Sequence, residues 1–328
     1  MGALFSAVLP VFLIVLAGAL CRIFAPSSAS WEQGLSQYGM YVAFPALIIN
    51  SLLKVRGQLA IDGEIYLLNT ILLLLLMAIP FIVTRWLKVA RPLANTYIIC
   101  IFFGNIGYLG FPIVTRLLGA EGFSAAALET SLALHISLYN IVLFSVGLLI
   151  LEFSRKALHT PVTASPAISA AAPSEIPSSA SPLRAIAANP LLLSVVAGVI
   201  IALCDIPLPD AIEEMIAILS QSATAVVLFG LGIFLPEVRF EKKTLGHVCA
   251  LSVLGLLVVP LVFMAAQAIF RPEAEFQVSI LEGAMPLAVS PFVLATSYPL
   301  IRNVIAGAIL VSTALSVITV PFILHCIR

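Results

Sequence analysis

Charged residues are scarce in this chain, and that scarcity excludes a water-soluble fold. Only 10% of its 328 residues are Asp, Glu, Lys or Arg, while 61% are hydrophobic; a soluble domain has about 25% charged residues. Apolar runs of about 20 residues recur along the chain, and each is long enough to cross the hydrocarbon core of a bilayer. The composition therefore predicts an integral membrane protein with the lipid bilayer as its surroundings.

Clustered basic residues, catalytic motifs and paired cysteines are lacking as well. Sixteen basic and sixteen acidic residues balance, without the basic patch that nucleic-acid-binding proteins carry. The H-E-x-x-H, G-x-S-x-G and G-x-x-x-x-G-K-[ST] motifs of metalloproteases, serine hydrolases and ATP-binding loops do not occur. The five cysteines are scattered, without metal-ligand spacing. We therefore expect no nucleic-acid partner, no metal site, no cofactor and no enzyme activity.

Ten apolar segments are predicted to be membrane-spanning helices. Charges and turn residues bound each of them, and unpaired backbone groups are too costly in lipid for any open structure other than a helix. The segments are 3–24, 35–53, 64–87, 93–118, 128–152, 186–205, 211–235, 244–269, 276–299 and 302–327. The expected fold is an all-α, multi-pass membrane protein.

A low-complexity stretch divides the ten segments into two sets of five. From Thr160 to Pro182, nineteen of twenty-three residues are Ala, Ser, Thr or Pro, a composition typical of flexible linkers. We predict an N-terminal repeat at 1–152, a linker at 153–184 and a C-terminal repeat at 185–328. Because five is odd, homologous halves would have inverted orientations, as in many secondary transporters. Pro112 and Pro286 lie 174 residues apart, as do the segment starts Leu128 and Arg302.

Lysine and arginine predict the orientation in the membrane. The loops on one side carry eleven of them and the loops on the other side carry five. The richer side is expected in the cytoplasm by the positive-inside rule. The linker is then cytoplasmic, and both termini are outside the cell. A bacterial inner or plasma membrane is the expected location.

The fourth and ninth segments contain residues that interrupt helices. Gly104 to Pro112 holds three glycines and a proline, and the ninth segment contains Gly283-Ala284-Met285-Pro286 and Ser290-Pro291. Proline removes a backbone donor and clashes with the preceding turn, so we expect a break near Gly110 to Pro112. A half-helix that begins at mid-membrane exposes N–H groups and a positive dipole end, which attract an anion. Packing kinks are the alternative explanation.

The run Asn105-Ile106-Gly107-Tyr108-Leu109-Gly110-Phe111-Pro112 resembles the N-x-G-[FY]-[LM]-G-x-P signature of the auxin efflux carrier family. Leu9-Pro10-Val11-Phe12, Phe44-Pro45-Ala46-Leu47, Leu231-Gly232 and Ala284-Met285-Pro286 also resemble that family at corresponding places. The resemblance implies two inverted five-helix repeats with crossed, broken helices four and nine, similar to cation/proton antiporters and bile-acid symporters. It further implies elevator-type transport and a scaffold that forms a homodimer.

The resemblance implies functional roles for Asn105, Pro112 and Pro286. Ser290-Pro291 departs from the family, where many members have a small residue followed by Asn. The residues expected at the substrate site share a position at or beside one of the two interruptions: Asn105, Gly107, Gly110, Pro112, Met285, Pro286, Ser290 and Pro291.

Polar residues within the apolar segments are further candidates. Glu282 lies about 10 Å into the ninth segment, where an unpaired charge costs roughly 2.5 to 3.5 kcal/mol. It is a candidate for coupling transport to H⁺ or Na⁺, and snorkelling to the interface is the alternative. His135 is a second ion-coupling candidate, with a hydrogen-bonded structural histidine as the alternative. Four polar residues either line a cavity or form interhelical hydrogen bonds: Asn50, Ser51, Asn140 and Gln221.

Because no ATP-binding loop occurs, an ion or substrate gradient is expected to drive transport. The expected substrate is a small organic anion, either a mono- or dicarboxylate such as malonate, malate or an auxin-like acid. A cation/proton antiporter is one alternative, although it would need paired acidic residues at the crossing. A receptor or sensor that binds a small ligand without moving it is the other.

Overall fold

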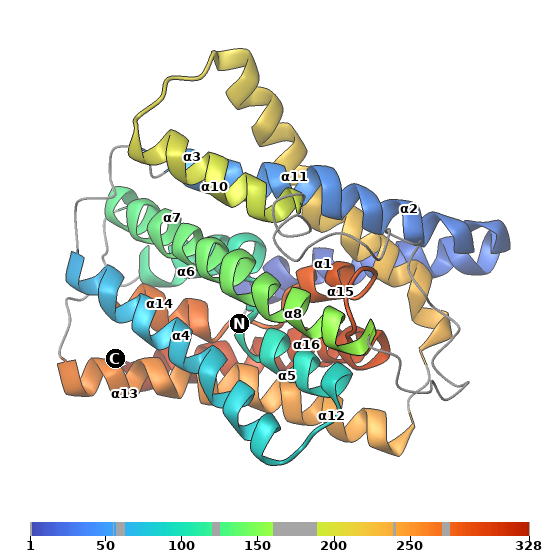
Figure 1. Cartoon of the computed structure of the whole chain (residues 1–328). Coiled ribbons are helices and arrows are strands. Elements are labelled where there is room, and N and C mark those ends of the chain that lie inside the picture. The colour runs from blue at the N-terminus through green and yellow to red at the C-terminus, as the bar shows by residue number, and fades with distance from the viewer. Residues whose placement is uncertain are drawn as a thin grey trace.

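Helices make up all the regular secondary structure in the described part of the chain, apart from one isolated β-bridge. The computed structural model describes residues 2–54, 56, 63–119, 125–159, 189–238, 241–270 and 276–327. Figure 1 shows the helices lying side by side, mostly along one direction. The predicted all-helical class is confirmed.

Helices occupy each of the ten predicted segments, and several segments contain more than one helix. In chain order the α-helices are α1 (Gly2–Phe24), α2 (Trp31–Tyr38), α3 (Phe44–Leu53), α4 (Gly63–Trp86), α5 (Arg91–Phe102), α6 (Phe111–Gly119), α7 (Ala125–Val142), α8 (Leu148–His159), α10 (Pro190–Leu203), α11 (Asp210–Phe234), α12 (Lys242–Val253), α13 (Val259–Phe270), α14 (Phe276–Gly283), α15 (Ser290–Leu294) and α16 (Arg302–Ile327). Single π-helical turns join neighbouring helices: η2 (Gly39–Ala43), η3 (Ile106–Gly110), η4 (Leu143–Gly147) and η7 (Leu254–Val258).

Several helices are long and apolar enough to cross a bilayer. Within the described ranges there are five, at Gly63–Trp86, Ser131–Arg155, Asp210–Glu237, Lys242–Phe270 and Arg302–Ile327. Shorter apolar helices lie at Leu9–Phe24 and Pro190–Leu203. Large apolar side chains on their outer faces are exposed, Leu67, Ile71 and Ile82 on α4 among them. These features support a multi-pass membrane protein, while the ten-span inverted repeat stays a prediction.

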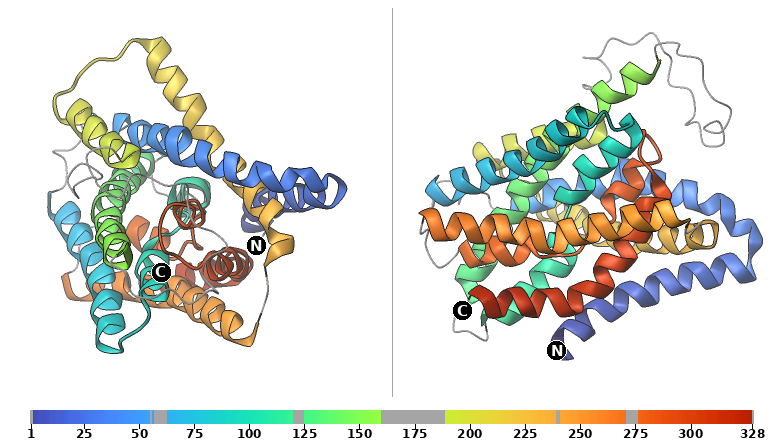
Figure 2. Two further views of the ribbon diagram at one scale, coloured as in Figure 1. Left: turned by 45° about the vertical axis from the view of Figure 1, so that its right-hand side comes forward. Right: turned by 90° about the horizontal axis from the view of Figure 1, so that it is seen from below.

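The helices pack into two groups. The α1–α11 bundle consists of α1, α2, α3, α10 and α11, in which α11 packs along α1, α2 and α3, and α10 packs on α3. The central bundle consists of α4 to α8 and α12 to α16, with close packing of α4 on α5, α12 on α16 and α13 on α14. Figure 2 (left) shows part of the C-terminal segment in the middle of the molecule, enclosed by helices from both halves of the chain.

Two glycines let α1 and α11 approach closely. A Cβ atom added at Gly18 would lie 2.2 Å from the Phe229 carbonyl oxygen, and one added at Gly232 would lie 2.1 Å from the Val15 carbonyl oxygen. Both distances are far shorter than a van der Waals contact, so only glycine fits at either position. Small residues at such crossings let membrane helices pack backbone to backbone.

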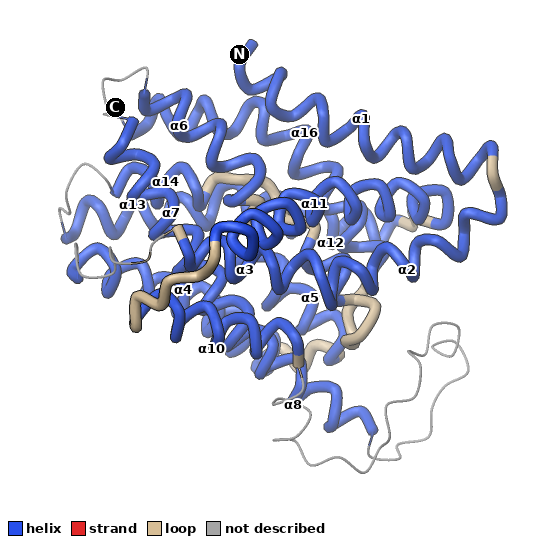
Figure 3. The backbone as a smooth tube through the Cα atoms, turned by 90° about the horizontal axis from the view of Figure 1, so that it is seen from above, coloured by secondary structure: helices blue, strands red, loops and turns tan. Residues whose placement is uncertain are grey.

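α8 continues to His159, so the predicted linker begins with helical residues, and the rest of that segment up to residue 184 lies outside the described residues. Figure 3 shows both chain termini at one edge of the molecule and the end of α8 at the opposite edge.

Candidate functional site

The fourth predicted span is interrupted, but not where the sequence placed the break. α5 ends at Phe102, residues 103–105 are not helical, and the chain resumes as η3, which runs directly into α6. The predicted break at Gly110 to Pro112 is therefore wrong by several residues. The Gly110 N–H donates to the Asn105 carbonyl (3.0 Å), five residues back. This wider π-turn leads from the interruption into α6, whose second residue is Pro112.

The ninth predicted span is interrupted where the sequence placed the break. α14 ends at Gly283, residues 284–289 are not helical, and α15 begins at Ser290. Pro291 lies in the first turn of α15, where its missing N–H needs no partner. A glycine at the end of one half-helix and a proline at the start of the next explain the interruption.

The two interruptions lie next to each other and pair through an antiparallel β-bridge. Gly104 and Leu287 form the β-bridge. The Asn105 N–H donates to the Pro286 carbonyl and the Ala288 N–H donates to the Phe103 carbonyl, each at 2.7 Å. Breaking each helix frees backbone groups that are costly to leave unpaired, so each interruption provides the partners that the other needs.

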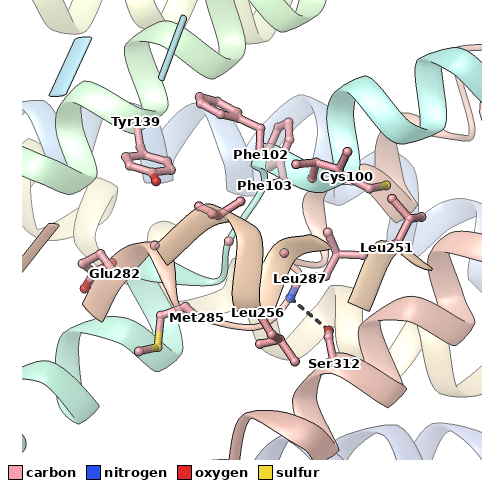
Figure 4. Close-up of a pocket in the computed structure, with 15 residues that line it drawn as sticks. Cys100, Phe102, Phe103, Tyr139, Leu251, Leu256, Glu282, Met285, Leu287 and Ser312 are labelled. Atoms are coloured by element: carbon pink, nitrogen blue, oxygen red, sulfur yellow. Dashed lines mark hydrogen bonds between the residues drawn. The ribbon is translucent and has the colours of Figure 1, made fainter. Parts of the chain in front are cut away.

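A small pocket adjoins this paired backbone. Its cavity volume is about 10 Å³, close to the least space that holds one water molecule. Most of its lining is apolar, and polar groups come from Tyr139 on α7, Glu282 on α14 and Ser312 on α16. Figure 4 shows the Ser312 hydroxyl accepting from the Leu287 N–H (3.0 Å). The pocket thus collects residues from helices that are far apart in sequence.

Glu282 is fully buried beside both interruptions. Its exposed fraction is 0%, and neither carboxyl oxygen has a hydrogen-bond partner among the described residues. A Cβ atom added at Gly110 would lie 2.5 Å from its Oε1 and 2.6 Å from its Oε2. The carboxyl group therefore packs directly against the backbone of η3, and the burial leaves no room for the snorkelling alternative.

His135 lies in the same buried region. Its Nδ1 is 3.2 Å from the Ser279 hydroxyl on α14, while its Nε2 has no partner among the described residues. The imidazole ring packs on Tyr139, with centroids 4.6 Å apart. Tyr139 in turn stacks on Phe102 at 5.3 Å, in the last turn before the first interruption. We did not predict Tyr139, although its place four residues after His135 puts both on one helix face.

Most of the residues predicted at the substrate site are brought together. Asn105, Met285 and Pro286 are buried in the two interruptions, and Gly110 lies against Glu282. Gly107 lies in η3, and Pro112 lies in the first turn of α6 with its side chain outside those described. The remaining two predicted residues, Ser290 and Pro291, are buried in the first turn of α15.

The four predicted cavity-lining residues lie elsewhere, and three of them make interhelical hydrogen bonds. The Asn140 amide donates to the Ser51 hydroxyl (3.0 Å), and the Asn50 amide donates to the Ser220 hydroxyl (3.2 Å). Gln221 is exposed on α11. None of the four predicted residues lines the pocket beside the interruptions. Hydrogen bonding of α3 to its neighbours α7 and α11 therefore explains the polar side chains of Asn50, Ser51 and Asn140.

Comparisons with known proteins bear on the same region. The "Membrane transport protein" family model matches residues 3–324. The chain is 25% identical over 333 residues, 100% of this chain and 97% of the relative, to a Rhizobium meliloti protein named "Putative malonate transporter". It is 25% identical over 320 residues, 96% of this chain and 95% of the relative, to an "Uncharacterized transporter" of Methanothermobacter thermautotrophicus.

A plant relative matches a shorter region. The chain is 28% identical over 111 residues, 32% of this chain and 30% of the relative, to the "Probable auxin efflux carrier component 5a" of Oryza sativa subsp. japonica. Together, the family match over nearly the whole chain and these relatives show that the chain belongs to the membrane transport protein family, which is the auxin efflux carrier family.

Proposed function

We propose that the protein is a secondary transporter that carries a small organic anion bound where the two helix interruptions meet. One observation carries the proposal: Asn105 pairs with Pro286, and Ala288 with Phe103, through backbone hydrogen bonds between two broken helices. Irregular backbone at membrane depth is tolerated only where it is buried in protein or lines a cavity. Broken helices at matching positions of two halves are typical of transporter substrate sites.

The start of η3 explains why the substrate would be an anion. The first N–H groups of a helix have no partner within it, and they lie at the positive end of the helix dipole. η3 and α6 form one continuous helical stretch, Ile106–Gly119, that begins at the interruption. We place a substrate carboxylate against Asn105 and this helix start. The residues proposed around it are Gly107, Gly110, Pro112, Met285, Pro286, Ser290 and Pro291.

The substrate class follows from the site and from the relatives. A helix start and an asparagine amide suit one carboxylate, and the named malonate transporter makes a short dicarboxylate the first compound to test. Malate and an auxin-like monocarboxylate are the next, because the plant relative is named an auxin efflux carrier component. All three offer the planar, charged group that backbone N–H donors bind.

Transport requires the site to open. The pocket of about 10 Å³ has room for about one water molecule, which is far less than a dicarboxylate needs. We propose elevator-type alternating access, in which the central bundle carries the site past the α1–α11 bundle. The exposed apolar face of α10, with Leu193, Val196 and Ile200, then offers a surface for a homodimer.

The proposed orientation places both termini outside the cell and the linker in the cytoplasm. It rests on the eleven-to-five distribution of Lys and Arg between the two sides. The position of both termini at the edge opposite to the end of α8 supports it (Figure 3). The membrane would be a bacterial inner or plasma membrane.

The test is uptake of labelled malonate by the purified protein in liposomes. Entry should exceed that into protein-free liposomes, and unlabelled malonate inside should accelerate it by exchange. A gradient of H⁺ or Na⁺ is the expected driving force, with Glu282 and His135 as candidate coupling residues. A receptor would bind malonate without moving it, so binding without uptake of malonate, malate or indole-3-acetate would refute the proposal.

Substitution tests the location of the site. Asn105→Ala removes the amide beside the helix start, so we expect uptake to fall at least about tenfold, the loss of roughly 1.4 kcal/mol of binding. Asn69→Ala is the matched control, because Asn69 is also a buried asparagine in a spanning helix but donates to its own helix at Ile65 (2.9 Å). Normal uptake by Asn105→Ala with normal membrane insertion would place the site elsewhere.

A further inference from the structure

The carboxyl group of Glu282 lies where the described residues offer no hydrogen bond or ion pair to a negative charge. Its exposed fraction is 0%, and both oxygens lack hydrogen-bond partners among the described residues. An ionised carboxylate loses its hydration there without gaining a counter-ion from any described side chain, which is far costlier than burying the neutral acid. The conformation described above therefore favours Glu282 in its protonated form.

Among the side chains that the structure describes, no cation lies against the carboxyl group of Glu282. α14 packs against α7, α13, α16, α6 and η3. The titratable groups of α7 that face Glu282 are His135 and Tyr139. α16 contributes Ser312 to the pocket lining, and α13 has no titratable residue. By sequence η3 adds Tyr108 and α6 adds Arg116, whose side chains lie outside those described. Cys100 of α5 also lines the pocket.

A metal cation is a poor match for this place. Among the described residues, no cluster of three His, Cys, Asp or Glu side chains occurs that could hold a metal ion. Hard cations bind through several oxygen ligands at once, whereas Glu282 has the Gly110 backbone against its oxygens. A proton needs only one oxygen, so it is the cation that this geometry can accept.

Glu282 also touches both interruptions. It packs on Gly110 of η3, and its own carbonyl accepts from the Met285 N–H (3.1 Å) in the second interruption. Any opening between the two interruptions must therefore change the environment of its carboxyl group. An anion that binds close by would repel an ionised Glu282 strongly in this low-dielectric region, so anion and proton are expected to bind together.

We propose that Glu282 is the proton-coupling residue of this transporter and that one proton moves with each organic anion in the same direction. The inference rests on the proposed function. The carboxylate of Glu282 takes a proton from water when the site opens on one side, crosses as the neutral acid together with the anion, and returns the proton to water on the other side. No covalent bond to the substrate forms, and charge is conserved in each step.

The first experiment measures proton movement with the unaltered protein. Adding malonate to detergent-purified protein in weak buffer should convert open protein with ionised Glu282 into the closed, protonated form. The protein then takes up a proton, seen as alkalinisation with a pH indicator dye. Liposomes with an acidic exterior, with valinomycin and equal K⁺ on both sides to hold the membrane potential at zero, should accumulate labelled malonate about tenfold per pH unit for one proton per anion. Malonate exchange without proton uptake and without pH-driven accumulation would overturn the coupling inference while leaving the proposed function intact. Absence of exchange would instead refute the proposed function.

The second experiment uses Glu282→Gln, which imitates the neutral acid but cannot release a proton. Malonate exchange should persist, while pH-driven accumulation should fall to that of a passive carrier. Glu152→Gln is the matched control, since Glu152 is a buried glutamate paired with Arg155 (2.9 Å); its ratio of accumulation to exchange should stay unchanged. Retained accumulation in Glu282→Gln, or loss of exchange in a variant that still inserts and folds, would overturn the inference.

Discussion

The contact between α1 and α11 leads to a sharp prediction at Gly232. A Cβ atom at this position would lie 2.1 Å from the Val15 carbonyl oxygen and 2.9 Å from the Gly18 Cα. A comfortable carbon-to-oxygen contact is about 3.3 Å, so Gly232→Ala should push the two helices apart by roughly 1.2 Å (3.3 minus 2.1). The obstructing atoms belong to backbone, which cannot rotate away as a side chain would.

Two effects of opposite sign decide the size of the loss. Separating the helices weakens dispersion contacts along the whole crossing, and overpacking of this kind costs about 1 to 3 kcal/mol. Alanine is a better helix former than glycine, which returns about 0.5 to 1 kcal/mol. The steric term wins because the overlap exceeds 1 Å. Because the overlap places the steric cost in the upper part of its range, about 2 to 3 kcal/mol, Gly232→Ala should be destabilised by about 1 to 2.5 kcal/mol.

Thermal denaturation in detergent, followed by tryptophan fluorescence, measures the effect as a fall in apparent Tm. Gly246→Ala is the matched control, because this glycine lies within α12 and a Cβ atom there would meet nothing within 4 Å. It should leave the apparent Tm unchanged or raise it slightly. An apparent Tm for Gly232→Ala at or above that of the unaltered protein would refute the close approach of α1 and α11.

Two partly buried ion pairs lead to the remaining predictions. Arg302 pairs with Glu32, and its guanidinium carbon lies 4.5 Å from the centroid of each of two phenylalanine rings. Arg302→Gln should lower the apparent Tm, because the lost contacts cost about 1 to 3 kcal/mol of stability. Arg302→Lys should recover part of that loss. An unchanged Tm for Arg302→Gln would contradict the pairing. Glu152 accepts a hydrogen bond from the Tyr298 hydroxyl and pairs with Arg155, each at 2.9 Å. Glu152→Gln should therefore also lower the apparent Tm, because it costs about 1 to 3 kcal/mol of stability. Tyr298→Phe removes only one of the two contacts and should lower the apparent Tm less; a larger fall for Tyr298→Phe would contradict these contacts.

The sequence predicts best the features that depend on local chemistry. Long apolar runs identify the spanning helices, because the bilayer requires about 20 apolar residues for each. Glycine and proline identify the interruption in the ninth span, where Gly283 ends one half-helix and Ser290-Pro291 starts the next. The isolated acid Glu282 also stands out, because a charge in an apolar run is costly wherever the helix packs.

Tertiary pairing determines the features that the sequence predicts poorly. The fourth span breaks at Phe103 to Asn105 because the second interruption supplies backbone partners there, whereas glycine and proline show only where a helix can be interrupted. The hydrogen bond from Asn140 to Ser51 likewise depends on how α3 packs against α7. A polar residue in an apolar run signals that a partner exists but does not identify it.

The most direct test of the central claim is an experimental structure of the protein with malonate bound. The claim predicts a malonate carboxylate between the two interruptions, within hydrogen-bond distance of the Asn105 amide or of the first N–H groups of η3. The claim would be contradicted if malonate bound elsewhere while residues Phe103 to Asn105 and Pro286 to Ala288 stayed paired with no ligand beside them.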